Sequence, residues 1–367
     1  MNIVIFGLSL SSSWGNGHAT TYRGLIKALS DRGHRISFIE KDVPWFAGNR
    51  DLPDPPYCDL YLYQDLKEIP LRFAALVAQA DLVILGSYVD RGAAVGEWIT
   101  RQATGITAFY DIDTPVTLAG LPERRIDYLT TSLIPRFHLY LSFAAGPALT
   151  EVAERYGSPC VRPLLCSADM DTHSAQDLPE GWALGYLGTY STDRQPGLEA
   201  LLCAPAQALP DERFVVAGPQ YPDDVAWPAN VERIPHLAPS DHSAFYSRQR
   251  FTLNVTRKDM VAIGYSPSVR LFEAAACRVP IISDRWAGIE TAFEPDTEIL
   301  IADGPRDVRA ILTEMPAERR RAIAQAAHAK LLRAHTAEVR ARQLESYVAE
   351  VLKEARRRKG RNVASVA

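Results

Sequence analysis

Short hydrophobic runs alternate with longer amphipathic segments along the first half of the chain. Residues 3–8 are almost all apolar and lead into a loop rich in Ser and Gly, as is typical of a strand buried on both faces. Residues 20–30 carry apolar side chains at helical spacing, and Gly33 ends this segment. The regular alternation predicts a doubly wound parallel sheet over residues 1–160. Its further strands are predicted at 34–40, 81–86, 106–110 and 139–143.

The alternation stops between residues 161 and 180, where prolines and aspartates replace the periodic apolar positions, so we expect a linker there. It resumes over 181–335, which predicts a second Rossmann-like domain and a cleft between the two. Residues 336–367 are predicted to contain a long amphipathic helix, over 336–358, that packs back on the N-terminal domain, and a basic tail at 356–361. The strands of the second domain are predicted at 182–187, 213–218, 231–234 and 251–255.

The composition excludes several classes of function but does not identify one. Of the 367 residues, 47% are hydrophobic and 23% charged, as in an ordinary globular protein, and the net charge of −4 gives no reason to expect nucleic-acid binding. The five cysteines contain no CxxC pair, which argues against a zinc site and a disulfide framework and favours a reducing cytoplasm. No signal peptide and no apolar run of about 18 residues is recognised, so no membrane span is expected.

The most informative segment is 264–277, where a turn rich in Gly, Ser and Pro opens a helix. The helix leads into the apolar run 279–282, which predicts a short buried strand. The first turn of such a helix has unpaired backbone N–H groups and the positive end of the helix dipole. These features suit an anion, and a diphosphate is the usual one. Glu273, further along the helix, is suitably placed for the hydroxyls of a ribose. The segment therefore predicts a nucleotide-diphosphate site.

With these features the chain resembles glycosyltransferases of the two-Rossmann-domain type, the GT-B fold. Within that group it is most similar to the spore-maturation-protein (CgeB-like) family and, more distantly, to family 4 glycosyltransferases. The resemblance covers nearly the whole chain and is strongest over 254–300, where 266–277 and 280–282 match the donor-nucleotide segment. It implies an α/β fold of two tandem Rossmann-like domains, with a nucleotide-sugar donor bound mainly by the second domain and an unknown acceptor bound mainly by the first.

The resemblance also implies roles for individual residues around the donor. Ser266, Ser268 and Val269 would place donors near the diphosphate, or the serines would simply cap the helix. Arg270 would face the phosphate or pair with Glu273. Family 4 carries a second glutamate at the position of Tyr265, so donor-sugar contacts and retaining stereochemistry do not transfer to this chain. Further donor-binding candidates are Thr189, Arg194, Arg257 and His236.

A second candidate site is the loop Trp14-Gly15-Asn16-Gly17-His18, between the first strand and the first helix. Small residues let the backbone approach a ligand closely. His18 sits where several inverting enzymes of this fold place a general base, and an imidazole can deprotonate a hydroxyl near neutral pH. The alternative is a polar or helix-capping histidine. Trp14, Gly15 and Gly17 are expected to line the acceptor cleft together with Asp113 and Tyr265.

The third candidate is Asp111-Ile112-Asp113 at the end of a predicted strand, where doubly wound sheets bind ligands. Asp111 would orient His18 or contact the acceptor, whereas an Asx turn before Pro115 is the alternative for Asp113. The Asp-x-Asp spacing is similar to the metal motif of the other glycosyltransferase fold, which this chain does not resemble. We therefore expect no metal and no cofactor.

Four functions remain open at this stage. The favoured one is a metal-independent glycosyltransferase, specifically a hexosyltransferase; the alternatives are an epimerase of the same fold and a catalytically silent nucleotide-sugar-binding protein. A nicotinamide oxidoreductase fits less well, because the loop before Glu40 is not a GxGxxG turn. The nucleotide base, the sugar, the acceptor, the stereochemistry and the oligomeric state are not readable from the sequence.

Overall fold

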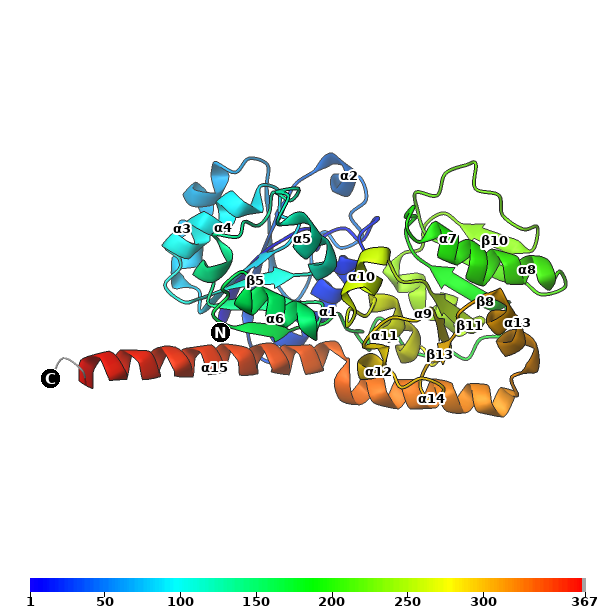
Figure 1. The fold of residues 1–367 in the computed structure, drawn as a ribbon. Coiled ribbons are helices and arrows are strands. Elements are labelled where there is room, and N and C mark those ends of the chain that lie inside the picture. The colour runs from blue at the N-terminus through cyan, green and yellow to red at the C-terminus, as the bar shows by residue number, and fades with distance from the viewer. Residues whose placement is uncertain (365–367) are drawn as a thin grey trace. The chain divides into compact units, whose positions relative to one another are not determined.

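The computed structural model describes residues 1–364, which form two α/β units (Figure 1). Unit 1 comprises residues 1–12, 22–165 and the chain from Glu338 onward, and unit 2 comprises 13–21 and 166–337. The predicted domains were consecutive, whereas the short segment 13–21 belongs to unit 2. The last helix belongs to unit 1, which contains the N-terminal domain on which it was expected to pack. Part of the predicted basic tail lies outside the described residues, because side chains are described only as far as Arg357.

Unit 1 is built on a seven-stranded parallel sheet in the order β3-β2-β1-β4-β5-β6-β7. The central strands consist of consecutive apolar residues because helices cover both faces of such a sheet. The edge strands are shorter or only half-buried. The strands are β1 (Asn2–Gly7), β2 (Arg35–Lys41), β3 (Asp59–Tyr63), β4 (Leu82–Gly86), β5 (Ile106–Asp111), β6 (Leu139–Ser142) and β7 (Val161–Pro163).

The helices of unit 1 come from both ends of the chain (Figure 1). The last helix, α15 (Ala337–Ala364), extends beyond the predicted end and is fixed to this unit by Glu345, which pairs with Arg32 at 2.6 Å and contacts His34 at 2.7 Å. Tyr347 donates a hydrogen bond to the Pro163 carbonyl on β7. The other helices are α1 (His18–Asp31), α2 (Pro44–Ala47), α3 (Glu68–Gln79), α4 (Gly92–Gln102), α5 (Thr114–Gly120), η1 (Ile134–Arg136) and α6 (Pro147–Glu154).

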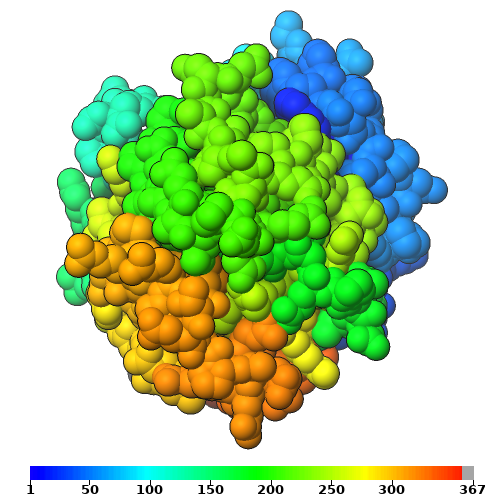
Figure 2. All heavy atoms as spheres, turned by 90° about the vertical axis from the view of Figure 1, so that its right-hand side faces the viewer, coloured from blue at the N-terminus to red at the C-terminus, as the bar shows by residue number. Residues whose placement is uncertain are grey.

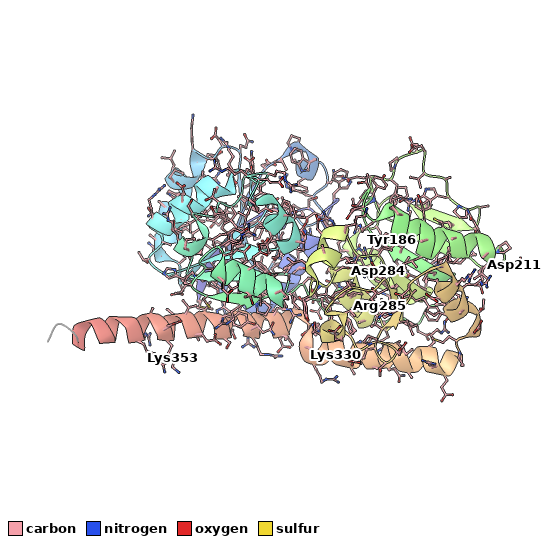
Figure 3. All side chains as sticks on the ribbon, in the orientation of Figure 1. Tyr186, Asp211, Asp284, Arg285, Lys330 and Lys353 are labelled. Carbon is pink, nitrogen blue, oxygen red and sulfur yellow. The ribbon has the colours of Figure 1, made fainter. Side chains whose placement is uncertain are left out.

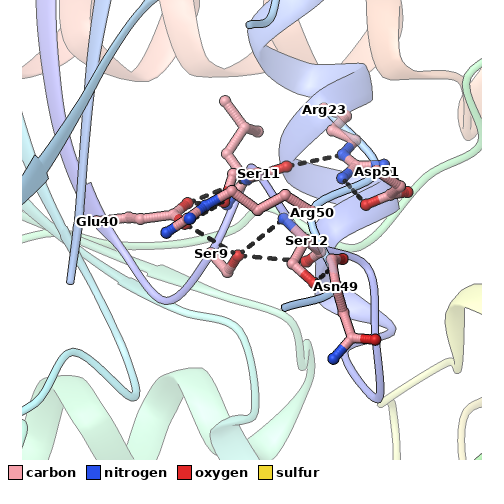
Figure 4. Close-up of polar contacts among 9 residues, drawn as sticks. Ser9, Ser11, Ser12, Arg23, Glu40, Asn49, Arg50 and Asp51 are labelled. Atoms are coloured by element: carbon pink, nitrogen blue, oxygen red, sulfur yellow. Dashed lines mark hydrogen bonds and ion pairs between the residues drawn. The ribbon is translucent and has the colours of Figure 1, made fainter. Parts of the chain in front are cut away.

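A buried carboxylate holds the loop that follows β1 (Figure 4). Glu40 on β2 is fully buried, and its Oε2 accepts the backbone N–H groups of Leu10 at 2.6 Å and Ser11 at 3.0 Å. The Ser11 hydroxyl donates to the other carboxylate oxygen and accepts a hydrogen bond from Arg50. Because these interactions occupy the carboxylate, Glu40 is not presented to a dinucleotide ribose, in line with the poor match to a nicotinamide site.

Unit 2 has a six-stranded parallel sheet in the order β10-β9-β8-β11-β12-β13. Its strands are β8 (Trp182–Leu187), β9 (Phe214–Ala217), β10 (Val231–Ile234), β11 (Gln249–Asn254), β12 (Ile281–Ser283) and β13 (Leu300–Ile301). Its helices are α7 (Gln195–Leu198), η2 (Glu199–Cys203), α8 (Ala204–Ala208), α9 (Pro239–Ser247), α10 (Lys258–Ile263), α11 (Val269–Ala276), α12 (Ile289–Ala292), α13 (Pro305–Glu314) and α14 (Ala317–Ala334).

The core of unit 2 joins the sheet to the helices that cover it. Leu184, Phe214 and Leu253 from three strands pack with Leu202 of η2 and Val308 of α13. In Figure 2 the orange segment, which contains α13, lies beside the green segment that contains η2 and α8. Among the described residues of both units, no helix is long and apolar enough to span a membrane.

In both sheets, strands are added first on one side of the first strand and then on its other side. In unit 1 the order changes between β1 and β4, and in unit 2 between β8 and β11. Ligands of doubly wound sheets bind at the carboxyl ends of the strands at this switch point. The fold therefore identifies one candidate binding edge in each unit.

Candidate functional site

Arg270 organises the switch point of unit 2. Its Nε donates to the Leu187 carbonyl at the end of β8 at 2.6 Å, and its Nη1 donates to Asn254 Oδ1 at the end of β11 at 2.7 Å. The guanidinium also lies over the Tyr186 ring, 4.5 Å from its centroid. Among the residues with described side chains, Arg270 makes no ion pair with Glu273, so that predicted pair is not found. Arg270 ties two strand ends to the start of α11.

The N-terminus of α11 has no side-chain cap. Ser268 occupies the N-cap position in an extended conformation, but its hydroxyl donates to Asn254 Oδ1 at 3.1 Å instead of capping the helix. The capping alternative for Ser268 is therefore excluded in this structure. Ser266 is buried, and Val269 is the first helical residue. The first-turn N–H groups lie at the switch point without a capping side chain, as an anion site requires.

Tyr265 and Gly264 shape the turn that enters α11. Tyr265 has a left-handed backbone, with φ 50°, and donates its N–H to the Ala287 carbonyl at 2.6 Å. A Cβ at Gly264 would lie 2.8 Å from the same carbonyl, and one at Gly288 would lie 2.4 Å from the Tyr265 ring. Tyr265 is therefore fitted tightly into its turn, at the position where family 4 has a glutamate.

Glu273 is buried among polar groups of unit 2. Its carboxylate accepts hydrogen bonds from Thr20 Oγ1 at 3.1 Å and from the Tyr246 hydroxyl at 3.2 Å. His173 Nε2 lies 3.5 Å from one carboxylate oxygen, and His242 Nδ1 lies 3.8 Å from the other. Burial favours the neutral carboxyl, but these histidines and hydroxyls outweigh it and lower the pKa of Glu273. A ribose contact for Glu273 stays a prediction, and the two histidines were not identified from the sequence.

The loop after β8 approaches the loop after β9 through two glycines. A Cβ at Gly218, where φ is 138°, would lie only 2.1 Å from the Gly188 carbonyl oxygen, so this contact requires glycine. Thr189 follows Gly188, and its carbonyl accepts a hydrogen bond from Arg194 Nη2 at 2.6 Å. Arg194 Nε is buried and has no hydrogen-bond partner. Thr189 and Arg194, both candidates for donor binding, thus lie together at the carboxyl edge of the sheet.

Arg257 follows the end of β11 on the same edge. Its Nε lies 4.0 Å from Asp193, which also accepts the backbone N–H of Lys258 at 3.0 Å. Asp284, labelled with Tyr186 in Figure 3, accepts the Thr256 N–H at 3.0 and 3.1 Å. His236 is exposed after β10. These contacts join the loops after β8, β11 and β12.

In the loop before α1, the side chain of Asn16 caps the start of the helix. Asn16 Oδ1 accepts the His18 N–H at 3.1 Å, while the buried Asn16 Nδ2 has no hydrogen-bond partner. Gly15 is left-handed, with φ 60°, and Gly15 and Gly17 are exposed. His18 is the first residue of α1 and is half-buried, as is Trp14. Helix capping in this loop belongs to Asn16, so the helix-capping alternative for His18 does not apply.

Asp111 is a core residue of unit 1. It is fully buried, and its oxygens accept hydrogen bonds from the Thr117 and Tyr140 hydroxyls, each at 2.6 Å. Burial raises its pKa to about 6. A direct contact between Asp111 and an acceptor does not fit this arrangement. Asp113 is also buried, at the N-cap of α5, and accepts a hydrogen bond from the Tyr88 hydroxyl at 2.7 Å.

A pocket of about 430 Å³ opens at the switch point of unit 1. The exposed ring of Trp45 and the ring of Tyr88 contribute to its wall. Lys41 and Asp90, which pair at 2.6 Å, add charge to the wall. The remaining lining residues are Gly7, Leu8, Val43, Phe46, Tyr63, Val89, Val116, Arg125, Ile126, Asp127 and Tyr128.

Sequence comparison finds one family. Residues 194–346 match a family model described as glycosyl transferase-like. No curated protein matches the chain. The matched region contains most of unit 2, including α11 and the loops after β9 and β11.

Solved structures of similar fold match nearly the whole chain. Sucrose-phosphate synthase from Thermosynechococcus elongatus superposes with a TM-score of 0.71 at 14% identity, covering 96% of this chain and 100% of that one. HepE from Anabaena, in complex with UDP-glucose, gives 0.67 at 14% identity over 96% and 100%. An α-glucosyltransferase in complex with UDP gives 0.68 at 12% identity over 95% and 100%. The predicted fold class is confirmed: the chain has the α/β fold of GT-B glycosyltransferases, with two parallel sheets and their helices.

Proposed function

We propose that this protein is a glycosyltransferase that moves a hexosyl group from a UDP-sugar to a hydroxyl of its acceptor. The main support is the N-terminus of α11, which has no capping side chain and lies at the switch point of unit 2. UDP is the nucleotide of choice because several structures of this fold were obtained with UDP or UDP-glucose bound.

The donor diphosphate lies, in this proposal, at the first turn of α11. Its charge is met by the N–H groups after Ser268, by the helix dipole, and by the guanidinium groups of Arg194 and Arg257. Thr189 adds a hydroxyl beside Arg194. The diphosphate therefore needs no divalent cation, and the reaction is proposed to be metal-independent.

The acceptor binds, in this proposal, in the pocket of unit 1 against Trp45 and Tyr88. Its hydroxyl oxygen forms a bond to the anomeric carbon of the donor sugar while the bond from that carbon to the diphosphate oxygen breaks. The His18 imidazole takes the hydroxyl proton, and UDP leaves with the bonding electron pair. The stereochemical outcome stays open because Tyr265 replaces the family 4 glutamate.

Two other functions of the same fold would also use a nucleotide-sugar site. An epimerase would convert the UDP-sugar without any acceptor, and a silent binding protein would bind it without turnover. The tightly fitted Tyr265 favours the silent protein over the epimerase, because it adds no catalytic carboxylate to the donor site.

The test measures donor binding first and turnover second. Isothermal titration with UDP, GDP and ADP, with and without added Mg²⁺, is expected to show preferential UDP binding that Mg²⁺ does not change. Arg194→Ala is expected to weaken UDP binding about tenfold or more. The matched control is Arg213→Ala, since Arg213 precedes β9 at the opposite edge of the sheet. UDP release that requires an added acceptor supports a transferase, while binding without release under any acceptor refutes it.

A further inference from the structure

Two histidines and a glutamate from separate segments meet inside unit 2. His173 comes from the segment between β7 and β8, His242 from α9 and Glu273 from α11. All three side chains are buried, and each offers a ligand atom within 4.8 Å of the others. Imidazole nitrogen and carboxylate oxygen are the ligand types that zinc-class metals take from proteins.

The spacing of these atoms fits a metal ion. Metal–ligand bonds of about 2.0–2.1 Å in a tetrahedral arrangement separate the ligand atoms by about 3.3–3.4 Å. His173 Nε2 lies 3.3 Å from His242 Nδ1 and 3.5 Å from Glu273 Oε1. His242 Nδ1 lies 3.8 Å from Glu273 Oε2. Small rotations of the side chains would therefore bring all three onto one ion.

Other residues hold the carboxylate in place. Thr20 Oγ1 donates to one oxygen of Glu273 and the Tyr246 hydroxyl donates to the other. The first of these oxygens faces His173 and the second faces His242. Such hydrogen bonds to a ligating carboxylate are a regular feature of metal sites.

We propose that His173, His242 and Glu273 bind one divalent transition metal of the zinc class. The ion would join the segment before β8 to α9 and α11, with water as a fourth ligand, as is usual when three protein ligands are present. It would secure the helix whose N-terminus is assigned to the diphosphate. A metal-bound Glu273 would not be available to a ribose, so this inference replaces that role. It does not rest on the transferase activity.

The first experiment uses the wild-type chain. Protein stripped with a chelator is titrated with Co²⁺ and, separately, with Zn²⁺ in competition with a chromophoric chelator. We expect uptake of about one ion per chain, visible d–d absorption typical of a tetrahedral nitrogen and oxygen site, and a higher melting temperature with Zn²⁺. No uptake, or uptake without a change in melting temperature, would mean that the cluster is a hydrogen-bonded group only.

Variants then assign the ligands. His242→Gln and Glu273→Gln are expected to weaken Zn²⁺ binding by more than about 100-fold and to abolish the Co²⁺ spectrum. The matched control is His328→Gln, because His328 on α14 belongs to the same unit but hydrogen-bonds the Ala275 carbonyl instead. Unchanged binding in both ligand variants overturns the assignment, and the wild-type titration decides the matter if a variant does not fold. UDP titration of the same samples separates failure of this site from failure of the donor site.

Discussion

Replacing Asp111 by Asn tests whether this carboxyl is a core residue. Burial raises its pKa from 3.8 to about 6, against the opposing effect of the Thr117 and Tyr140 hydroxyls. At pH values between about 4 and about 6, Asp111 keeps its proton in the folded protein but releases it in the unfolded chain. The free energy of unfolding therefore falls as the pH rises from about 4 to about 6, and then levels off. A shift of about two pKa units corresponds to roughly 3 kcal/mol of this decrease.

The Asp111→Asn variant cannot titrate at this position, so its free energy of unfolding is expected to lack that decrease. Urea unfolding followed by tryptophan fluorescence between about pH 4 and pH 7 measures the difference between variant and wild type. The Asp113→Asn variant is the control and should keep most of the decrease, because burial is the largest cause of the Asp111 shift. A difference between Asp111→Asn and wild type that does not change with pH would refute the reasoning.

Three further substitutions test the loops and the pocket. His18→Gln is expected to lower kcat about 10²- to 10⁴-fold with unchanged UDP affinity, and an unchanged kcat would remove His18 as the base. Gly218→Ala should destabilise the protein by about 2–4 kcal/mol, because the new Cβ would meet a carbonyl oxygen at 2.1 Å; wild-type urea stability would contradict that contact. Trp45→Ala should raise the acceptor KM about 3- to 10-fold and change stability by less than about 0.5 kcal/mol, since this ring is 56% exposed. An unaltered KM would place the acceptor elsewhere.

The sequence predicted the strands that are buried on both faces and missed the edge strands β3, β7 and β13. Strand β7 begins at Val161, so the first residues of the predicted linker 161–180 belong to the sheet of unit 1. The strands β1 and β4 are continuous apolar runs because helices cover both faces of the sheet. Such runs can be recognised directly in the sequence. Strand β3 has the sequence Asp-Leu-Tyr-Leu-Tyr and is mostly half-buried at the edge of its sheet, so its pattern is weaker. The grouping of residues 13–21 with unit 2 depends on tertiary contacts that no local pattern records.

The candidate site was predicted in part. The turn before α11 could be located because it is rich in Gly, Ser and Pro and opens a helix, and the loop with Thr189 and Arg194 because it follows a predicted strand, where this fold binds ligands. The role of Arg270 could not be predicted, since its bonds to Leu187 and Asn254 depend on the packing of separate strands. His173 and His242 are 69 positions apart, and neither lies in a motif, so only the folded chain brings them together.

The use of both chain ends in unit 1 has a consequence for biosynthesis. Helix α15 carries Glu345 and Tyr347, whose partners Arg32, His34 and Pro163 leave the ribosome long before it. Unit 2 ends at residue 337 and has all its segments available earlier. Unit 1 is therefore the first to be started and the last to be completed, and nascent chains that stop before α15 leave its docking surface on unit 1 uncovered.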